Sequence, residues 1–369
     1  MSKKVNFLDG ALVAVTAALL FAVCVLCFVL PQRSFSEEEN RRLATWRTPS
    51  WQSILDGSFS EALGEVYRDQ FPKRNAWIAG KAYSELLLGK RENNRILWGE
   101  DGYLMARNEY RDLSVAEENL RAVAEHSEML TVWIPRSADV MTIHLPHAYP
   151  SEAASGLYHL LDGRGEIPWR ELRDAAEQGT QVYYRTDHHL TTEGAYLVYR
   201  SLGEVLGYTP VERESFEKQT VSENFFGSAD SASGGIALRA DVVELFRYAG
   251  DGEFLLTDQT TGEKREGFYD WSALEQKDQY EVFLGGNYAH LTVEATNKEK
   301  PRLLLVKDSF ANAIVPFLAI HFDLEIVDPR CLSDEVTVEK CDQILILQGV
   351  DTLATNPSLK KITLIKQKS

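Results

Sequence analysis

The stretch RLLLVKDSF (residues 302–310) decides the fold class of this 369-residue chain. Its apolar run is typical of a central strand in a parallel sheet, which is buried on both faces. Parallel sheets bind ligands beyond the carboxyl ends of their strands, and Ser309 falls at that end. A helical pattern over residues 310–321 follows at once, so Ser309 is predicted at a helix N-terminus, where free N–H groups can receive an oxyanion.

The same alternation of strand and helix recurs elsewhere in the chain and indicates an α/β fold with a parallel sheet. The stretch of residues 208–300 interrupts it with Gly, Ser, Thr and turn signals, and is predicted to be a β-rich insertion. Further strands are predicted at residues 130–135, 181–184, 324–328 and 343–348, and helices at 114–126 and 192–206, with two helices over 59–88 that bend at Phe71 and Pro72.

The N-terminal segment predicts a membrane anchor. Residues 11–30 contain no charge and no proline, and such a helix can cross a hydrocarbon core of about 30 Å. The apolar run is longer than that of a signal peptide, and Lys3 and Lys4 before it favour a cytoplasmic N-terminus. The predicted organisation is a cytoplasmic segment (1–10), an uncleaved transmembrane helix (11–30), a tether (31–55) and an extracytoplasmic domain (56–369).

Composition narrows the classes of partner. The net charge of −16, from 39 basic and 55 acidic residues, disfavours nucleic acid as a partner. Four cysteines are too few for a disulfide framework, and pairing of Cys331 with Cys341 stays open. No metal or other cofactor is expected, because His144 and His147 lack a third ligand and the later strands offer no ligand set around Asp187-His188-His189.

The stretch TDHHLTTEGAY (residues 186–196) carries the second half of the predicted chemistry. If it leaves its strand in an extended form, Asp187 and His189 point to one face and His188 to the other. His189 is then the base, and Asp187 can hold its Nδ1–H and stabilise the imidazolium. With Ser309 as nucleophile, these residues form a predicted Ser-His-Asp triad.

Several blocks in order resemble the DHHW family of anchored bacterial proteins. The family is similar to the alginate O-acetylation proteins, whose domain has a circularly permuted SGNH hydrolase fold. The resemblance implies a three-layer sandwich around a parallel sheet, and a triad whose Asp-x-His motif precedes the serine, as Asp187, His189 and Ser309 do. The blocks that carry it include residues 187–189, FLGGN (283–287) and KDSFAN (307–312), together with 69–74, 101–104 and 226–228.

Two positions depart from the family pattern. Leu190 replaces the tryptophan of the naming motif, and Gly349 stands where the family would offer a polar residue, often asparagine. The oxyanion donors are therefore sought in the N–H of Ser309 and in Gly286 or Asn287, although Asn287 could be an ordinary turn residue. His188 is a further candidate for oxyanion or substrate contact.

The predicted function is an extracytoplasmic O-acetyltransferase that acts on a cell-envelope or exopolysaccharide glycan. Acetyl-CoA is absent outside the cell and a single helix cannot carry an acyl group across. An extracytoplasmic transferase of this kind would therefore require a multi-pass partner similar to the membrane-bound O-acyltransferases. Two alternatives stay open: a glycan O-acetyl esterase, which passes the acyl group to water, and a catalytically silent glycan-binding or scaffold subunit.

Overall fold

A computed structural model describes residues 7–36, 41–107, 110, 112–126, 128–147, 149, 155–250, 253–296 and 299–368. The chain groups into two units: residues 1–90 with 234–236, and residues 91–233 with 237–369. The expected boundary between tether and domain, at residues 55 and 56, stays a prediction. Lys3 and Lys4, on which the expected orientation of the anchor depends, lie outside the described residues.

The second unit is built on a seven-stranded sheet with the order β10-β9-β11-β13-β12-β15-β6. The four strands from β13 to β6 are mutually parallel, whereas β11, β9 and β10 are antiparallel to their neighbours. The expected parallel sheet is therefore a mixed one, because the predicted insertion adds its own strands to one edge. The bounds are β6 (Met129–Ile134), β9 (Phe254–Asp258), β10 (Lys264–Glu266), β11 (His290–Ala295), β12 (Arg302–Lys307), β13 (Asp323–Val327) and β15 (Gln343–Gly349).

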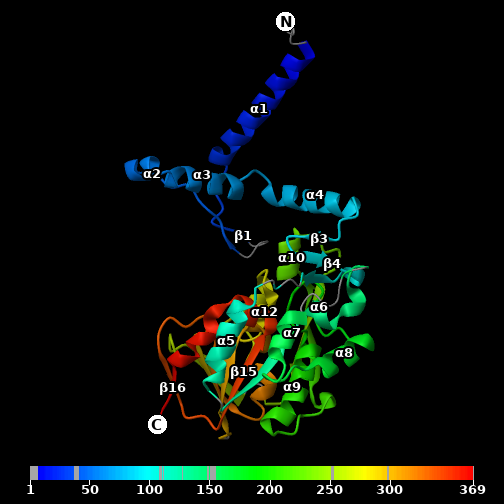
Figure 1. Cartoon of the computed structure of the whole chain (residues 1–369), viewed down its shortest axis with the longest axis vertical. Helices are drawn as coiled ribbons and strands as arrows, with labels where there is room; N and C mark the ends of the chain where they lie inside the picture. Colours follow the sequence, from blue (N-terminus) through cyan, green and yellow to red (C-terminus); the bar gives the residue numbers. More distant parts are fainter. Residues whose placement is uncertain are drawn as a thin grey trace. The chain divides into compact units, whose positions relative to one another are not determined.

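Both faces of the sheet are covered, which explains the apolar runs in its central strands. Alternate residues of β12 enter different cores: Leu303 and Leu305 pack in one, and Leu304 and Val306 in the other. Figure 1 shows β15 between α5 and α9. One core holds α8 (Trp169–Glu177), α9 (Thr192–Leu206) and α11 (Val315–Leu318), and the other α5 (Ser114–Ala124), α7 (Ser155–Leu161), α12 (Val350–Thr355) and the 3-10 helix η8 (Pro357–Leu364).

Smaller elements surround this three-layer core. A three-stranded sheet joins β3 (Glu92–Asn93), β4 (Ile96–Trp98) and β5 (Leu104–Ala106), an antiparallel pair joins β7 (Glu217–Phe225) and β8 (Asp241–Arg247), and a parallel pair joins β14 (Val336–Val338) and β16 (Ile365–Gln367). Short helices in this unit include α6 (Ser137–Val140), α10 (Ser228–Ser233), η5 (Trp271–Glu275), η6 (Gln279–Val282) and η7 (Ser309–Ala311).

The first unit is mainly helical. Helix α1 (Phe7–Val29) contains Gly10–Val29, which by length and composition could cross a membrane. The predicted bend at Phe71 and Pro72 separates α3 (Ser58–Asp69) from α4 (Arg74–Leu87). The segment expected to be a tether contains β1 (Phe35–Ser36), β2 (Arg41–Arg42) and α2 (Trp51–Leu55). Asp69 holds it in place by accepting hydrogen bonds from Arg41 Nη2 at 2.6 Å and Ala44 N at 2.8 Å.

Two predicted elements differ in the structure. Residues 181–184 are not a strand, and Tyr183 forms only a single antiparallel bridge with Leu190. The helix expected over residues 310–321 is split into η7 and α11. Pro316 lies in the first turn of α11, where its missing N–H is tolerated. In the middle of a continuous helix the same proline would break a backbone hydrogen bond, which explains the division.

Substitution of Gly349 by alanine tests the contact between the ends of β15 and β12. A Cβ at this position would lie 2.6 Å from a ring carbon of Phe310, which is itself buried. We expect Gly349→Ala to lower the free energy of unfolding by about 1–3 kcal/mol, the usual range for overpacking, in denaturant titrations. Gly156→Ala in α7 is the matched control, since its nearest atom would lie 3.7 Å away. Equal stability of both variants would show that Phe310 can move aside.

Candidate active site

Ser309 lies directly beyond the carboxyl end of β12, where η7 begins, and is partly exposed. The preceding residue, Asp308, is fully buried and fixes this turn. Its Oδ1 accepts a hydrogen bond from Phe310 N at 3.0 Å, and its Oδ2 accepts one from Gly349 N at 2.9 Å. Asp308 therefore joins the turn at Ser309 to the ends of two neighbouring strands.

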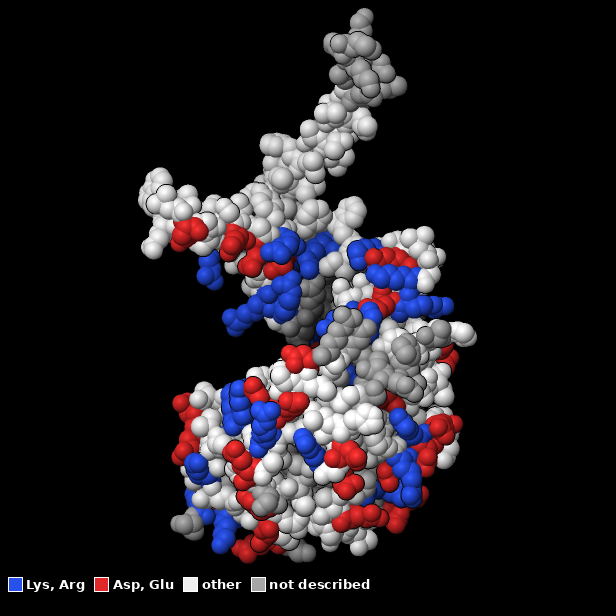
Figure 2. All heavy atoms as spheres, in the orientation of Figure 1, with Lys and Arg blue, Asp and Glu red and all other residues white. Residues whose placement is uncertain are grey.

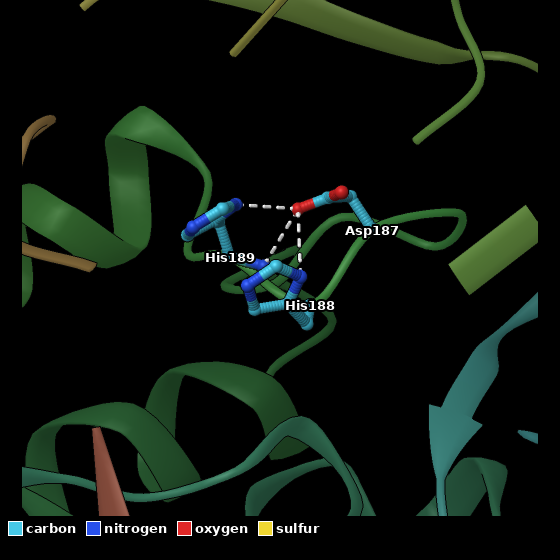
Figure 3. A group of neighbouring side chains, drawn as sticks. All are labelled: Asp187, His188 and His189. Atoms are coloured by element: carbon cyan, nitrogen blue, oxygen red, sulfur yellow. Dashed lines mark hydrogen bonds and ion pairs between the residues drawn. The ribbon is translucent and has the colours of Figure 1, made fainter. Parts of the chain in front are cut away.

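Asp187 and His189 meet through a bend in the backbone. Asp187 Oδ1 accepts hydrogen bonds from His189 N at 2.9 Å and from His189 Nδ1 at 2.6 Å (Figure 3). The segment from Arg185 to His189 is a series of bends, whereas the sequence predicted an extended form. The predicted pairing is thus present on a different backbone, because an aspartate side chain readily bonds the N–H two residues later.

The opposite nitrogen of His189 reaches the serine. His189 Nε2 lies 2.9 Å from Ser309 Oγ, across 120 residues of sequence. A carboxylate can only accept, so Nδ1 carries the proton toward Asp187 and Nε2 is free to accept the hydroxyl proton. This series of contacts has the geometry by which a base activates a serine hydroxyl while an acid orients the base.

The second oxygen of Asp187 is held by the first residue of α10, a position that the sequence did not mark as functional. Asp187 Oδ2 accepts hydrogen bonds from Ser228 N and Ser228 Oγ, both at 2.7 Å. A Cβ on Gly227 would lie 2.3 Å from Asp187 Cβ, so the carboxylate can approach this closely only because residue 227 is glycine. Residues 226–228 entered the sequence analysis only as one block of the family resemblance.

The charges of this pair are set by burial and by each other. Burial opposes ionisation of Asp187, but the imidazoles of His188 and His189 and the N–H of Ser228 outweigh it and hold the pKa of this carboxyl well below its usual range. Burial lowers the pKa of His189 to about 4, with His188 acting in the same direction and Asp187 in the opposite one. His189 is therefore neutral near pH 7, as a general base must be.

His188 lies on the same side as His189, not on the opposite face as the extended form predicted. Its ring centroid is 3.8 Å from that of His189, and its side chain is 45% exposed. Its Nδ1 lies 2.7 Å from Ser228 Oγ, which donates to Asp187 and so accepts from His188. His188 thus borders the site and belongs to the same hydrogen-bond network.

Tyr280 is a site residue that sequence reasoning missed. Its ring stacks on His189 with centroids 3.8 Å apart and planes at 4°. Its hydroxyl donates to the carbonyl of Ser309 at 3.0 Å, and burial raises its pKa well above the usual value, so it remains a donor. Tyr280 comes from η6 and marks no motif, so only its position in space reveals the contact with both His189 and Ser309.

Asn287 and Gly286, the predicted oxyanion candidates, lie beside a buried lysine. Lys307 Nζ donates to Asn287 Oδ1 at 3.2 Å and also to Asn312 Oδ1. Asn312 Nδ2 in turn donates to Asn287 Oδ1 at 3.4 Å and to the carbonyl of Gly286 at 3.3 Å. Burial lowers the pKa of Lys307 to about 8, while Asp328 and Asp308 act to raise it. Among the described residues, Asn287 Nδ2 donates no hydrogen bond, and Asn287 is exposed.

The side chains of the site include three groups that could bind a metal ion. Asp187, His188 and His189 each offer a ligand atom, all within 4.8 Å of one another. However, Asp187 accepts four hydrogen bonds, and both histidine Nδ1 atoms are engaged as donors. His144 pairs with Asp101 at 3.0 Å instead of completing a ligand set. The donor set fits a proton-transfer site better than a metal centre.

Comparison with known proteins places these residues within one family match. Residues 169–327 match the model of the family described as DHHW protein. A DHHW family protein from Eubacterium siraeum is similar in structure, with a TM-score of 0.59 and 18% identity over 75% of this chain and 98% of that one. The structure of Bacillus cereus PatB1 with a sulfonyl adduct has a TM-score of 0.58 and 18% identity, and the match covers 72% of this chain and 97% of PatB1. The O-acetyltransferase domain of Pseudomonas putida AlgJ has a TM-score of 0.42 and 14% identity, and the match covers 71% of this chain and 92% of that domain.

No curated protein matches the chain. The structural likeness to the first two proteins establishes a shared mixed α/β fold. The family match spans Asp187, His189 and Ser309, together with Gly286 and Asn287. The resemblance to the DHHW family that the sequence indicated is therefore confirmed.

Proposed function

We propose that this chain is an extracytoplasmic SGNH-type O-acetyltransferase that modifies a cell-envelope or exopolysaccharide glycan. The observation that carries the proposal is the continuous series of hydrogen bonds from Ser309 Oγ through His189 to Asp187. The Asp-x-His motif precedes the serine, which is the circularly permuted order of the alginate O-acetylation proteins that the sequence resembles. The choice of acetyl group and glycan rests on that resemblance.

The proposed reaction has two halves that use the same three side chains. Ser309 Oγ attacks the acyl carbonyl while His189 Nε2 takes its proton, and the leaving group departs with that proton to give an acyl-serine. A sugar hydroxyl then attacks the acyl-serine, gives its proton to His189, and Ser309 Oγ recovers a proton as the product ester leaves. Asp187 holds Nδ1–H throughout and stabilises the transient imidazolium.

Asn287 is proposed as an oxyanion donor alongside the N–H of Ser309. Because Lys307 Nζ can only donate, the atom of Asn287 that faces it must be the oxygen, and the amide nitrogen is directed away from Lys307. Gly349, at the position where the family would offer a polar residue, has no side chain and gives its N–H to Asp308. The donor missing there is therefore assigned to Asn287, with Lys307 as the residue that orients it.

The proposal includes delivery of the acyl group from the membrane. Helix α1 is proposed to anchor the chain with its second unit outside the cell, where acetyl-CoA is not available. A multi-pass membrane-bound O-acyltransferase would then supply the acyl group to Ser309. An esterase would use the same first half and differ only in the acceptor, and the partial exposure of Ser309 admits water as well as a sugar hydroxyl.

Sulfonylation tests the nucleophile without knowledge of the substrate. The full chain in detergent is treated with phenylmethylsulfonyl fluoride and the adduct is followed by intact mass. We expect one adduct, its absence in Ser309→Ala, and a rate lower by about 10²–10⁴ in His189→Ala because the general base is lost. Turnover of 4-nitrophenyl acetate should fall in parallel in both variants.

His188→Ala is the matched control for the base. It removes an adjacent imidazole from the same network but leaves the contact between His189 and Ser309, so its sulfonylation rate should stay within about tenfold of the wild-type rate. Thermal unfolding confirms that each variant is folded. A larger loss of sulfonylation rate in His188→Ala than in His189→Ala would reverse the assignment of the base. An unchanged adduct in folded Ser309→Ala would show that Ser309 is not the nucleophile.

Substitution of Asn287 tests the oxyanion assignment. Asn287→Ala should lower kcat for 4-nitrophenyl acetate by about 10²–10³ with a smaller change in KM, as for loss of one oxyanion donor. Asn287→Asp keeps the acceptor toward Lys307 but loses the amide donor, and should be similarly impaired. Asn224→Ala, an exposed asparagine of β7, is the matched control. A kcat within threefold of wild type in folded Asn287→Ala would exclude this amide as a donor.

Topology decides whether an acyl-supplying partner is required. We expect protease added to spheroplasts of bacterial cells that express the full chain to digest the second unit, and high-salt washing to leave the chain in the membrane. A cytosolic protein of similar size serves as the control for spheroplast integrity. Protection of the second unit from protease, or its recovery in the cytosol, would contradict both the anchor and the partner.

A further inference from the structure

The first unit contains a cavity of about 430 Å³ between α3 and α4. Its apolar lining consists of Tyr67, Phe71, Trp77 and Ile78. Three cations also line it, Arg68, Arg74 and Lys81, and no carboxylate stands among its described lining residues. We propose that this cavity binds the headgroup of an anionic phospholipid, so that α3 and α4 lie on the membrane surface. The proposal rests on the membrane anchor proposed above and adds a lipid site to it.

The position of the cavity relative to the anchor follows from ring contacts. Phe28, in the last turn of α1, meets the ring of Tyr67 with centroids 5.4 Å apart and that of Trp46 at 5.3 Å. Because α1 ends at Val29, Tyr67 lies beside the end of the apolar stretch that would cross the membrane. Aromatic side chains at the end of a span are typical of the headgroup region. The cavity that Tyr67 lines is therefore placed at headgroup depth.

Helices α2 and α4 expose large apolar side chains that water would not favour. On α4, Trp77 is 67% exposed and Leu87, the last residue of the helix, is 88% exposed. Leu88, which caps the helix, is 86% exposed. On α2, Trp51 and Leu55 are 82% and 84% exposed. Such exposed residues mark an interaction surface, and with nearby cations they are the pattern of helices that lie in a membrane interface.

The charge of the cavity lining favours an anionic lipid over a neutral one. Figure 2 shows Lys and Arg side chains near α3 and α4, with Asp and Glu side chains among them, and Lys81 pairs with Glu85 at 3.1 Å. The Nε atoms of Arg68 and Arg74 donate to carbonyls of α3, Gly64 O at 3.2 Å and Arg68 O at 3.0 Å, which fixes both guanidinium groups beside the apolar lining. Guanidinium groups suit phosphate oxygens, and the apolar lining suits the acyl chains that a soluble phosphate lacks.

The test uses the full chain in nanodiscs of phosphatidylcholine alone or with an equal share of phosphatidylglycerol. Hydrogen exchange of the backbone amides of residues 67–81 reports the site, and native mass spectrometry after transfer to detergent counts retained lipid. We expect slower exchange with phosphatidylglycerol and preferential retention of that lipid. The triple variant Arg68→Gln, Arg74→Gln, Lys81→Gln should lose the preference at least about tenfold.

The matched control is the triple variant Lys360→Gln, Lys366→Gln, Lys368→Gln, which makes the same change in charge on the second unit and should keep the preference. Trp77→Ser is a second variant that leaves all three cations and removes part of the apolar lining, so it should weaken retention even if the first triple variant unfolds. Equal exchange and retention with both lipid compositions would overturn the proposal. Soluble glycerol phosphate added to phosphatidylcholine discs should not slow the exchange of residues 67–81. If it slows exchange as much as phosphatidylglycerol does, the site binds a free phosphate and not a lipid.

Two readouts separate this proposal from the earlier ones. Sulfonylation of Ser309 in the same discs reports the second unit, and resistance to alkaline extraction reports the anchor. A chain that resists extraction and forms the adduct but shows no phosphatidylglycerol preference would lose only the lipid site. Release by alkaline extraction would overturn the anchor and the lipid site together, while leaving the assignment of Ser309 intact.

Discussion

The buried carboxylate of Asp187 is the interaction on which the candidate site depends. An isolated ionised carboxylate in a protein interior costs several kcal/mol, so it persists only where donors surround it. Asp187 receives four hydrogen bonds, two from His189 and two from Ser228. Those donors come from the bend at residues 185–189 and from the start of α10, which the same carboxylate therefore holds together. The lack of a side chain on Gly227 is what lets the start of α10 approach Asp187.

Asp308 holds the backbone at Ser309 in place, as Asp187 holds His189, but it does so through the backbone N–H groups of Phe310 and Gly349. It spans from η7 to the end of β15 and so transmits the register of the sheet to Ser309. Tyr280 then links the two halves, because one side chain stacks on the base and bonds the backbone of the nucleophile. The distance between Ser309 Oγ and His189 Nε2 is thus fixed by packed, hydrogen-bonded groups on both sides, which lowers the cost of reaching a reactive geometry.

The parts of this arrangement that depend on local sequence patterns could be predicted. The apolar run before Lys307 predicted β12 and the position of Ser309, and residues 192–206 predicted α9 with its residue bounds. The antiparallel edge could not be predicted, because strands β9 to β11 show only local turn signals and their pairing is decided by long-range contacts. The bend at Asp187 was missed for a related reason: a side chain that bonds a nearby N–H competes with extended backbone, and the competition is settled by partners such as Ser228.

Asn287, which we propose as an oxyanion donor, shows how a buried charge can orient a side chain near a site that the family pattern leaves incomplete. Lys307 is 1% exposed and is the last residue of β12, so its ammonium must find acceptors within the protein. The acceptors are the side-chain oxygens of Asn287 and Asn312, and a group that can only donate leaves each amide just one orientation. The nitrogen of Asn312 then turns back to Gly286 and Asn287, which leaves the nitrogen of Asn287 as the one amide donor of the pair without a partner among the described residues. Desolvation of a lysine, usually a cost to stability, here sets the direction of the group that we assign to the oxyanion.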